Sequence, residues 1–408
     1  MEEKCYIGID LNDHYAMISY YQLNKKEPET IALGVGGTMY QIPTLLAKKK
    51  TLAQWYYGDD ARKKAKTSEV ICVDALLPRA LHREQIYIEG ETYEAIDLLA
   101  VFLKKVMELP KMLGNVDSCN CLVLTVEHLS QENMEVLQEV FAKIGLTQEQ
   151  FMLIDYKESF YYFTISQPQQ LWIRNVYLFE YDGESLQYYA LDRNTRTMPQ
   201  VVTIKESHFF TLQEPKDESF FQILQKAFDN QVISSVFLVG EGFEGGWMQK
   251  SLSFLCRGRR AFVGNNLFSK GACYAAYMKE SPIKRKVIYM GDNEMRFNLC
   301  LKMKNRGKVD FFTLINAGKN RFEEKGECEM ILSGTPEIDF WKQLPSSREA
   351  IIEKVTLTDF PKRPDRTTRL HILATPIAND KIEVEIRDLG FGEIFKSTNK
   401  VWKYIITV

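Results

Sequence analysis

The chain opens with an apolar run at residues 5–11, a polar turn at 12–14 and a second apolar run at 16–21. Two such runs on either side of a short polar turn predict a β-hairpin. Its first strand carries one carboxylate, Asp10, toward the turn. An acid in that position can face a metal ion bound to a phosphate. It also occurs in ordinary N-terminal hairpins, so this stretch alone leaves both interpretations open.

Over the first two thirds of the chain, segments whose apolar residues have helical spacing alternate with segments typical of strands. Apolar positions at helical spacing predict helices over about 93–108 and over 130–144, and Ser130 and Gly145 fit the N-cap and the C-terminal stop of the second helix. The nearly continuous apolar run at 122–126 is typical of a strand buried on both faces of a sheet. Strands and helices that alternate in this way predict an α/β fold.

A second hairpin repeats the design of the chain's opening. A strand at 176–181 reaches an acidic, glycine-containing turn at 182–185 and returns through 186–191. A further apolar run at 236–240 ends in the glycine-rich segment 241–246, which opens a predicted helix. Glycines there let a backbone approach an anion closely. The simpler interpretation is a turn before a helix.

From about residue 284 the chain consists of short apolar runs separated by turn signals, with little helical periodicity. Short strands at this spacing predict an antiparallel sandwich or barrel. We therefore expect an α/β domain over 1–284 and a β-rich domain over 285–408. The strands predicted for the second domain lie at 287–290, 297–303, 309–314, 328–332, 351–357, 369–373 and 382–386.

Composition narrows the class of protein. The chain has 408 residues, 45% of them hydrophobic, and a formal net charge of -2. This balance gives no reason to expect nucleic acid or an anionic membrane as the partner. No apolar run approaches the roughly 20 residues that cross a bilayer, and the acidic start of the chain does not resemble a signal peptide. The eight cysteines are scattered, as free thiols are in a reducing compartment, so we expect a cytoplasmic protein.

The order of these segments resembles the ATPase domain of the superfamily of actin, sugar kinases and seventy-kilodalton heat-shock chaperones. Residues 7–11 match the first phosphate loop of that family, 176–185 stand where the second would be, and 237–242 resemble the adenosine-side motif. The match spans about 1–280. Further chaperone-like pieces lie at 42–44, 58–61, 122–145 and in the small-residue helix that contains 271–276.

The resemblance implies a duplicated actin-like ATPase fold, with two ribonuclease H-like halves that hold a nucleotide between them, followed by a β-rich domain. It implies ATP or ADP with magnesium as the ligand. Asp10 would be both the catalytic residue and the metal ligand, acting through a metal-bound water. The residues that would contact the nucleotide are Asp10, Leu11, Asn12, Gly183, Ser185, Gly240, Glu241 and Gly242.

The chain departs from the family where the phosphates would lie. The family has Gly-Thr-Thr after the first Asp-Leu, whereas this chain has Asn-Asp-His at 12–14. The second loop carries Asp182 and Glu184, and Gln187 replaces a further acid of the family. Acids close to a triphosphate are unfavourable unless a cation intervenes. A degenerate loop should therefore lower the rate of hydrolysis sharply.

Two further departures from the family concern the catalytic glutamate and the subdomain that covers the adenine. The catalytic glutamate of the chaperones falls near Tyr156, with Glu158 two residues on, and the alignment of that helix does not establish Glu158 as a substitute. The interval 191–236 is too short for the subdomain that covers the adenine in actins and chaperones. Half of the usual base clamp is therefore expected to be missing.

Two functions follow from these observations. The first is a chaperone-like pseudo-ATPase, a binding or scaffold protein with weak or no nucleotide hydrolysis, which the lost glycines and added acids favour. Its partner would be a protein or peptide that binds the C-terminal β domain, because sheet edges and loops are usual recognition sites. The alternative is an active ATP-binding, chaperone-type ATPase. For the cofactor, two alternatives stay equally open: ATP or ADP with magnesium, or none.

Overall fold

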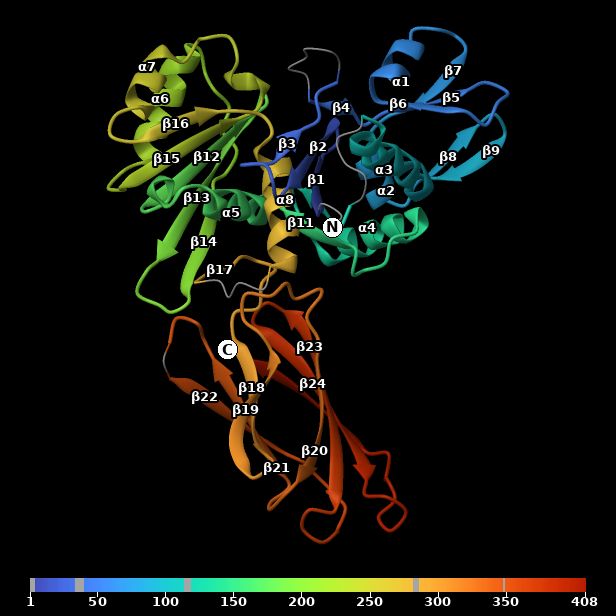
Figure 1. The fold of residues 1–408 in the computed structure, drawn as a ribbon, viewed down its shortest axis with the longest axis vertical. Coiled ribbons are helices and arrows are strands. Elements are labelled where there is room, and N and C mark those ends of the chain that lie inside the picture. The colour runs from blue at the N-terminus through green and yellow to red at the C-terminus, as the bar shows by residue number, and fades with distance from the viewer. Residues whose placement is uncertain (1–3, 34–39, 114–118, 282–285, 348) are drawn as a thin grey trace. The chain divides into compact units, whose positions relative to one another are not determined.

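The computed structural model describes residues 4–33, 40–113, 119–281, 286–347 and 349–408 (Figure 1). The chain divides into two compact units, which we call the first unit (residues 1–192 and 204–283) and the second unit (193–203 and 284–408). The predicted boundary between 284 and 285 lies outside the described residues. Segment 193–203, which the sequence analysis placed in the first domain, groups with the second unit.

The first sheet of the first unit is built around β1 (Cys5–Leu11), in which every residue is buried. β1 pairs antiparallel with β2 (Tyr15–Gln22), as the predicted hairpin requires, and parallel with β10 (Cys121–Val126). The strand order is β11-β10-β1-β2-β3, and β4 also pairs with β2. The remaining strands are β3 (Glu29–Thr30), β4 (Ile42–Pro43) and β11 (Phe151–Asp155).

The second sheet repeats this arrangement. Its central strand β12 (Asn175–Tyr181) pairs antiparallel with β13 (Leu186–Asn194) and parallel with β15 (Ile233–Val239), which pairs parallel with β16 (Arg260–Val263). With β14 (Gln200–Glu206), the order β16-β15-β12-β13-β14 matches that of the first sheet position by position. The mixed α/β character expected for this region is confirmed.

Caps fix the ends of the helices. In α4 (Gln131–Ile144), the Ser130 hydroxyl accepts a 3.1 Å hydrogen bond from the Asn133 N–H, and Gly145 ends the helix in the left-handed conformation. α3 (Ala95–Met112) runs past the predicted end and includes Pro110 in its last turn. No helix in the described ranges is long and apolar enough to cross a membrane. The other helices of the first unit are α1 (Gly58–Lys64), α2 (Leu76–Leu81), α5 (Tyr156–Ser166), α6 (Lys216–Ala227), α7 (Gln249–Leu255), α8 (Leu267–Glu280) and the short 3-10 turns η1 (Gln169–Leu171) and η2 (Glu241–Phe243).

Helix α8 packs very closely on β1 and α5, as its small residues predict. A Cβ atom on Gly8 of β1 would lie 2.2 Å from the carbonyl oxygen of Ser269, and one on Gly271 would lie 2.2 Å from that of Ser159. The Ser159 hydroxyl also donates a 2.6 Å hydrogen bond to the carbonyl of Phe268. Glycine is required at both contacts, since any side chain would push the backbones apart.

The two halves of the first unit differ in what they insert between sheet strands. The first half inserts a three-stranded sheet, the β8–β9 hairpin and helices α1–α3 between β4 and β10. In the second half, the fully described stretch 207–232 contains α6 and an isolated bridge at Phe210. This agrees with the short interval noted in the sequence. The inserted strands are β5 (Leu46–Lys49), β6 (Trp55–Tyr57), β7 (Val70–Val73), β8 (Gln85–Ile88) and β9 (Glu91–Glu94).

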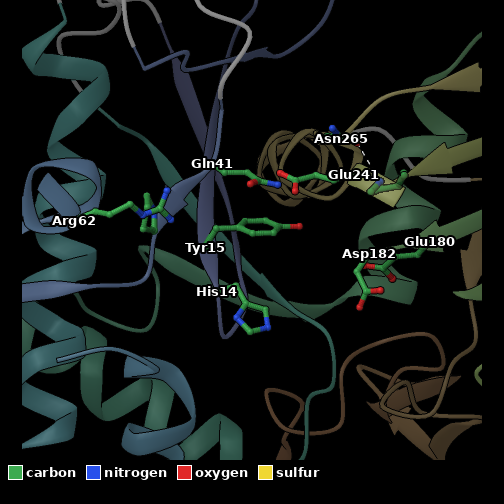
Figure 2. Close-up of a pocket in the computed structure, with 11 residues that line it drawn as sticks. His14, Tyr15, Gln41, Arg62, Glu180, Asp182, Glu241 and Asn265 are labelled. Carbon is green, nitrogen blue, oxygen red and sulfur yellow. Dashed lines mark hydrogen bonds between the residues drawn. The ribbon is translucent and has the colours of Figure 1, made fainter. Parts of the chain in front are cut away.

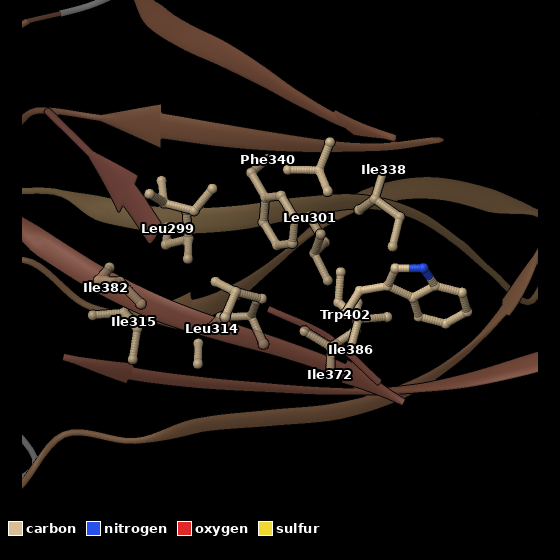
Figure 3. Packing of buried hydrophobic residues seen from close by; sticks show 14 of the residues in the cluster. Leu299, Leu301, Leu314, Ile315, Ile338, Phe340, Ile372, Ile382, Ile386 and Trp402 are labelled. Carbon is tan, nitrogen blue, oxygen red and sulfur yellow. The ribbon is translucent and has the colours of Figure 1, made fainter. Parts of the chain in front are cut away.

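The second unit contains two four-stranded antiparallel sheets, β19-β18-β21-β22 and β20-β23-β24-β25. Their inner faces share one core, in which Leu299, Leu301 and Phe340 of one sheet pack against Ile372 and Trp402 of the other (Figure 3). The predicted strands did not include β21 or β25. The strands are β17 (Val287–Tyr289), β18 (Asn298–Asn305), β19 (Lys308–Ile315), β20 (Gly326–Leu332), β21 (Glu337–Gln343), β22 (Ala350–Thr356), β23 (Thr368–Ala378), β24 (Lys381–Gly390) and β25 (Val401–Thr407).

Candidate functional site

A pocket of about 280 Å³ lies where the two predicted hairpin turns of the first unit approach each other (Figure 2). The first hairpin contributes residues from the start of β2, and the second contributes the end of β12 and the turn after it. The turn after β15 closes the pocket beside the second hairpin. The lining residues are His14, Tyr15, Gln41, Pro43, Arg62, Glu180, Asp182, Val239, Gly240, Glu241 and Asn265.

Tyr15 occupies the centre of this pocket. Figure 2 shows its ring extending from the first hairpin toward the side that carries Glu180 and Asp182. Burial raises the pKa of the Tyr15 phenol well above its usual value, and the nearby carboxylates Asp10 and Glu180 raise it further. The phenol is therefore neutral at physiological pH. A large aromatic side chain already stands where the resemblance would place a nucleotide's phosphates.

Asp10 lies fully buried at the end of β1. Its Oδ1 accepts a 2.7 Å hydrogen bond from the Tyr156 hydroxyl, and its Oδ2 has no hydrogen-bond partner among the described residues. Burial raises the pKa of this carboxyl to about 7, although the Tyr156 bond lowers it. The Tyr156 ring stacks on Phe268 with 3.8 Å between centroids. Within the described parts of the chain, no group of three or more His, Cys, Asp or Glu residues could hold a metal ion.

The turn after β1 uses its own side chain to satisfy its backbone. Asn12 Oδ1 accepts hydrogen bonds from the N–H groups of His14 and Tyr15, both at 2.9 Å. Leu11, just before the turn, is fully buried. Backbone N–H groups in a turn of this kind are what a phosphate-binding loop offers to its ligand. Here an amide oxygen already occupies that place.

The turn after β12 does the same with a carboxylate. Asp182 Oδ1 accepts hydrogen bonds from the N–H groups of Glu184 and Ser185, both at 2.7 Å. Gly183 between them adopts a positive φ of 107°, which favours glycine. Hydrogen bonds to an ionised oxygen are stronger than neutral ones. The Asp182 carboxylate therefore occupies the place in this turn where an anion from solution would bind.

Glu180 places a second carboxyl in the pocket wall. Gln187 Nε2, from the opposing strand, donates a 3.0 Å hydrogen bond to Glu180 Oε2. Burial raises the pKa of Glu180 to about 8, and the neighbouring carboxylates Glu127 and Asp10 add to the shift. Glu180 is therefore largely protonated at neutral pH.

The turn after β15 packs against the second hairpin. A Cβ atom on Gly242 would lie 2.6 Å from the Gly183 nitrogen and 2.4 Å from the Tyr181 ring, so the packing of the turns requires glycine here. The Gly240 N–H donates a 3.0 Å hydrogen bond to Asn265 Oδ1. Glu241 faces the pocket, and Figure 2 shows it pointing toward Gln41 on the other side.

The structure thus brings the three predicted loops together, but their residues take different places. Gly240 and Glu241 line the pocket, whereas Asp10 and Leu11 are buried and Asn12, Gly183, Ser185 and Gly242 form the turns around it. Sequence reasoning missed Tyr15, Gln41, Arg62 and Asn265. Tyr15 directly follows the predicted polar turn, and this position could have pointed to it.

Comparison with protein families gives two matches. A family model described as "Family of unknown function (DUF5716) C-terminal" matches residues 27–292, more than half of the chain. A second, described as "Domain of unknown function (DUF8552)", matches residues 294–408. No curated protein matches the chain. The first match contains all of the pocket's lining residues except His14 and Tyr15.

Proposed function

The chain belongs to the DUF5716 C-terminal family, and we propose that it is a chaperone-like pseudo-ATPase, a binding or scaffold protein with weak or no nucleotide hydrolysis. The repeated strand order of the two sheets supports a duplicated actin-like fold for the first unit. So does the meeting of both hairpin turns at one pocket. A fold does not by itself establish a function, so the chemistry of the pocket must carry the proposal.

The occupied N–H groups of the two turns carry this proposal. A phosphate loop works because its backbone donors are free to bind an anion. In this chain Asn12 and Asp182 each accept two of those donors at 2.7–2.9 Å. A phosphate would have to displace both side chains. Displacing Asp182 would also leave its carboxylate beside the incoming phosphate, and like charges at short range repel.

The burial of Asp10 also supports weak or absent nucleotide hydrolysis. A metal-bound water needs an ionised carboxylate within reach of solvent. Asp10 is buried, its pKa is raised to about 7, and one oxygen is bonded to Tyr156. Since phosphoryl transfer depends on positioning and on charge neutralisation by a metal, hydrolysis should be weak or absent.

Calorimetric titration of ATP and of ADP with magnesium into the full chain tests this proposal. We expect no heat and no thermal shift at millimolar nucleotide, for the wild-type chain and for Asp10→Ala alike. Micromolar binding that Asp10→Ala weakens would overturn the proposal. It would favour the alternative, an active chaperone-type ATPase, and a turnover assay would then measure its rate.

We further propose that a protein or peptide partner binds the second unit on the outer face of the β19-β18-β21-β22 sheet. Phe311 packs edge-on against Trp341 at 5.1 Å between centroids, and Lys302 lies 5.6 Å from the Trp341 ring. Ile352 stands opposite Trp341 in the register, and Phe311 and Ile352 are about half exposed. Aromatic and aliphatic side chains grouped in this way are typical of interaction surfaces.

The other sheet of the sandwich provides the contrast and the control. Ion pairs join its neighbouring strands, including Arg369–Glu329 at 3.5 Å between β23 and β20 and Lys403–Glu385 at 3.2 Å between β25 and β24. A partner captured with the wild-type chain should be lost with Phe311→Asp and kept with Ile405→Asp, an exposed aliphatic residue of β25. Equal capture by the two variants would contradict the assignment of this face.

A further inference from the structure

Strand β16 forms one edge of the second sheet in the first unit. It pairs only with β15 in the part of the chain that the structure describes, and Arg260, Phe262 and Val263 are exposed. The backbone groups on the far side of an edge strand can pair with a further strand. Ser235 stands opposite Arg260 and Phe237 opposite Phe262, so Arg260 and Phe262, two positions apart, lie on the same face.

A basic groove of about 580 Å³ lies at the start of β16. Arg174, Arg259 and Arg260 line it, and none of its lining residues is acidic. The Arg259 guanidinium is held in place, 4.7 Å from the Phe228 ring centroid and 5.1 Å from that of Phe254. Arg174 and Arg260 are exposed and form no ion pair with the described residues. In a chain of net charge -2, a groove of this kind favours an acidic ligand.

An apolar pocket of about 240 Å³ lies at the other end of the same strand. Phe163 packs on Phe237 at 5.4 Å, and Phe237 stacks on Phe262 at 5.2 Å, so aromatic rings form much of its wall. At its rim Lys270 pairs with Glu27 at 3.4 Å. The segment from Gln167 to Arg174 contributes lining residues to this pocket and to the basic groove. The two hollows therefore follow each other along β16.

We propose that the β16 edge binds an extended acidic segment of a partner protein. The segment adds to the sheet as a strand, its carboxylates face Arg174 and Arg260, and an apolar side chain about two positions away enters the pocket beside Phe262. The apolar pocket beside an open strand edge favours a peptide over a nucleic acid, which would need bases to stack in the basic groove. This inference does not depend on nucleotide binding.

Two fluorescein-labelled peptides test the proposal on the full chain by fluorescence anisotropy. One is Glu-Asp-Glu-Thr-Val-Thr-Phe-Thr, and the other carries the same residues in reverse order, because a strand can add in either direction. We expect one of them to bind. Its affinity should fall about tenfold or more with Arg174→Glu/Arg260→Glu and with Val263→Glu, and should weaken as salt rises. Arg196→Glu, at an exposed arginine of the β13–β14 turn, is the control and should bind as the wild type does.

Circular dichroism and thermal unfolding confirm that each variant is folded before it is compared. The proposal fails if neither peptide binds, or if the variants of the groove and pocket bind as tightly as Arg196→Glu does. It also fails if a peptide with lysines in place of the acids binds equally well. A single-stranded oligonucleotide that binds more tightly than either peptide, and loses affinity in Arg174→Glu/Arg260→Glu, would assign the groove to nucleic acid instead.

Discussion

The Tyr156 hydroxyl donates a 2.7 Å hydrogen bond to Oδ1 of Asp10, 146 positions earlier in the chain. Tyr156 opens α5, near the position where the chaperone resemblance expects a catalytic glutamate, and Asp10 is where it expects a metal ligand. A phenol bonded to a buried carboxyl cannot activate water as a carboxylate can. The two positions that would have to cooperate in hydrolysis are therefore joined as a structural contact.

Removing the Tyr156 hydroxyl tests that contact. In Tyr156→Phe, Oδ1 of Asp10 loses its hydrogen-bond donor, and neither oxygen then has a partner among the described residues. The pKa of Asp10 therefore rises further and its ionised form becomes more costly. We expect a loss of about 1–3 kcal/mol in the free energy of unfolding near pH 8 and a smaller loss near pH 5, where Asp10 is neutral. Urea unfolding at the two pH values measures the difference. Equal losses at both would contradict a role for Tyr156 in solvating the Asp10 carboxylate.

Asp10 itself should make the first unit less stable as pH rises. Its pKa, raised to about 7 in the folded chain, exceeds its unfolded value. The folded state therefore holds the proton more tightly, and stability falls from about pH 4 to about pH 7 and then levels off. Asp10→Asn cannot ionise and still offers Oδ1 to Tyr156. It should exceed the wild type by about 4 kcal/mol near pH 8 and match it near pH 4. Asp13→Asn, at an exposed side chain of the adjacent turn, is the control for the general effect of replacing an acid by its amide.

The sequence predicts elements where local chemistry decides them. Ser130 and Gly145 fix the ends of α4 through their own conformations. The continuous apolar run of β1 predicts a buried strand, and every residue of β1 is buried. β21 was missed for a physical reason. It buries one face of a sandwich, so Ile338 and Phe340 point inward while Asp339 and Trp341 alternate with them, and no apolar run stands out.

The pocket could be predicted only in part, because its residues come from separate elements. The sequence shows the turns that hold Asp182 and Gly240, since each follows an apolar strand. It does not show that Gln41 and Arg62, outside those strands, lie at the same pocket. Nor does it show that Asn12 uses its side chain within its own turn, because that depends on the turn's conformation.

Releasing the backbone N–H groups of the turn after β12 from Asp182 should allow that turn to bind an anion. Asp182→Gly removes a carboxylate from the pocket wall and releases the N–H groups of Glu184 and Ser185. We expect a loss of about 1 kcal/mol in stability from the missing hydrogen bonds. We also expect calorimetric binding of inorganic pyrophosphate that the wild type lacks. Asp182→Ser, which keeps a side-chain acceptor, is the control and should bind less than Asp182→Gly does.

The close approach of α8 to β1 makes Gly8 sensitive to a single added atom. In Gly8→Ala the new Cβ atom would lie 2.2 Å from the Ser269 carbonyl oxygen and 2.5 Å from the Cys273 nitrogen, so the helix must shift. We expect a loss of about 1–3 kcal/mol in the free energy of unfolding. In Gly264→Ala the nearest atom would be 4.0 Å away, so this matched variant should change stability little. Similar unfolding midpoints for the two variants would refute the packing argument.

The second unit contains a buried ion pair whose loss should be severe. The Arg363 guanidinium bonds both oxygens of Asp388, at 2.7 Å and 2.8 Å, and both side chains are almost fully buried. Thr398 donates two further hydrogen bonds to Asp388, from its N–H at 2.9 Å and from its hydroxyl at 2.7 Å. These partners hold the pKa of Asp388 well below its usual value, although burial opposes them.

Arg363→Met should therefore destabilise the second unit by about 3–5 kcal/mol, because it leaves the Asp388 carboxylate buried without its cation. The double variant Arg363→Met/Asp388→Asn should recover part of this loss, since it removes the unpaired charge. Because the folded pKa of Asp388 is depressed, the pair stabilises the wild type above the ordinary carboxyl pKa and loses that effect as pH falls below it. Scanning calorimetry at neutral pH and at about pH 3 measures both effects. A single variant no less stable than the double one at neutral pH would contradict the cost assigned to the unpaired Asp388 carboxylate.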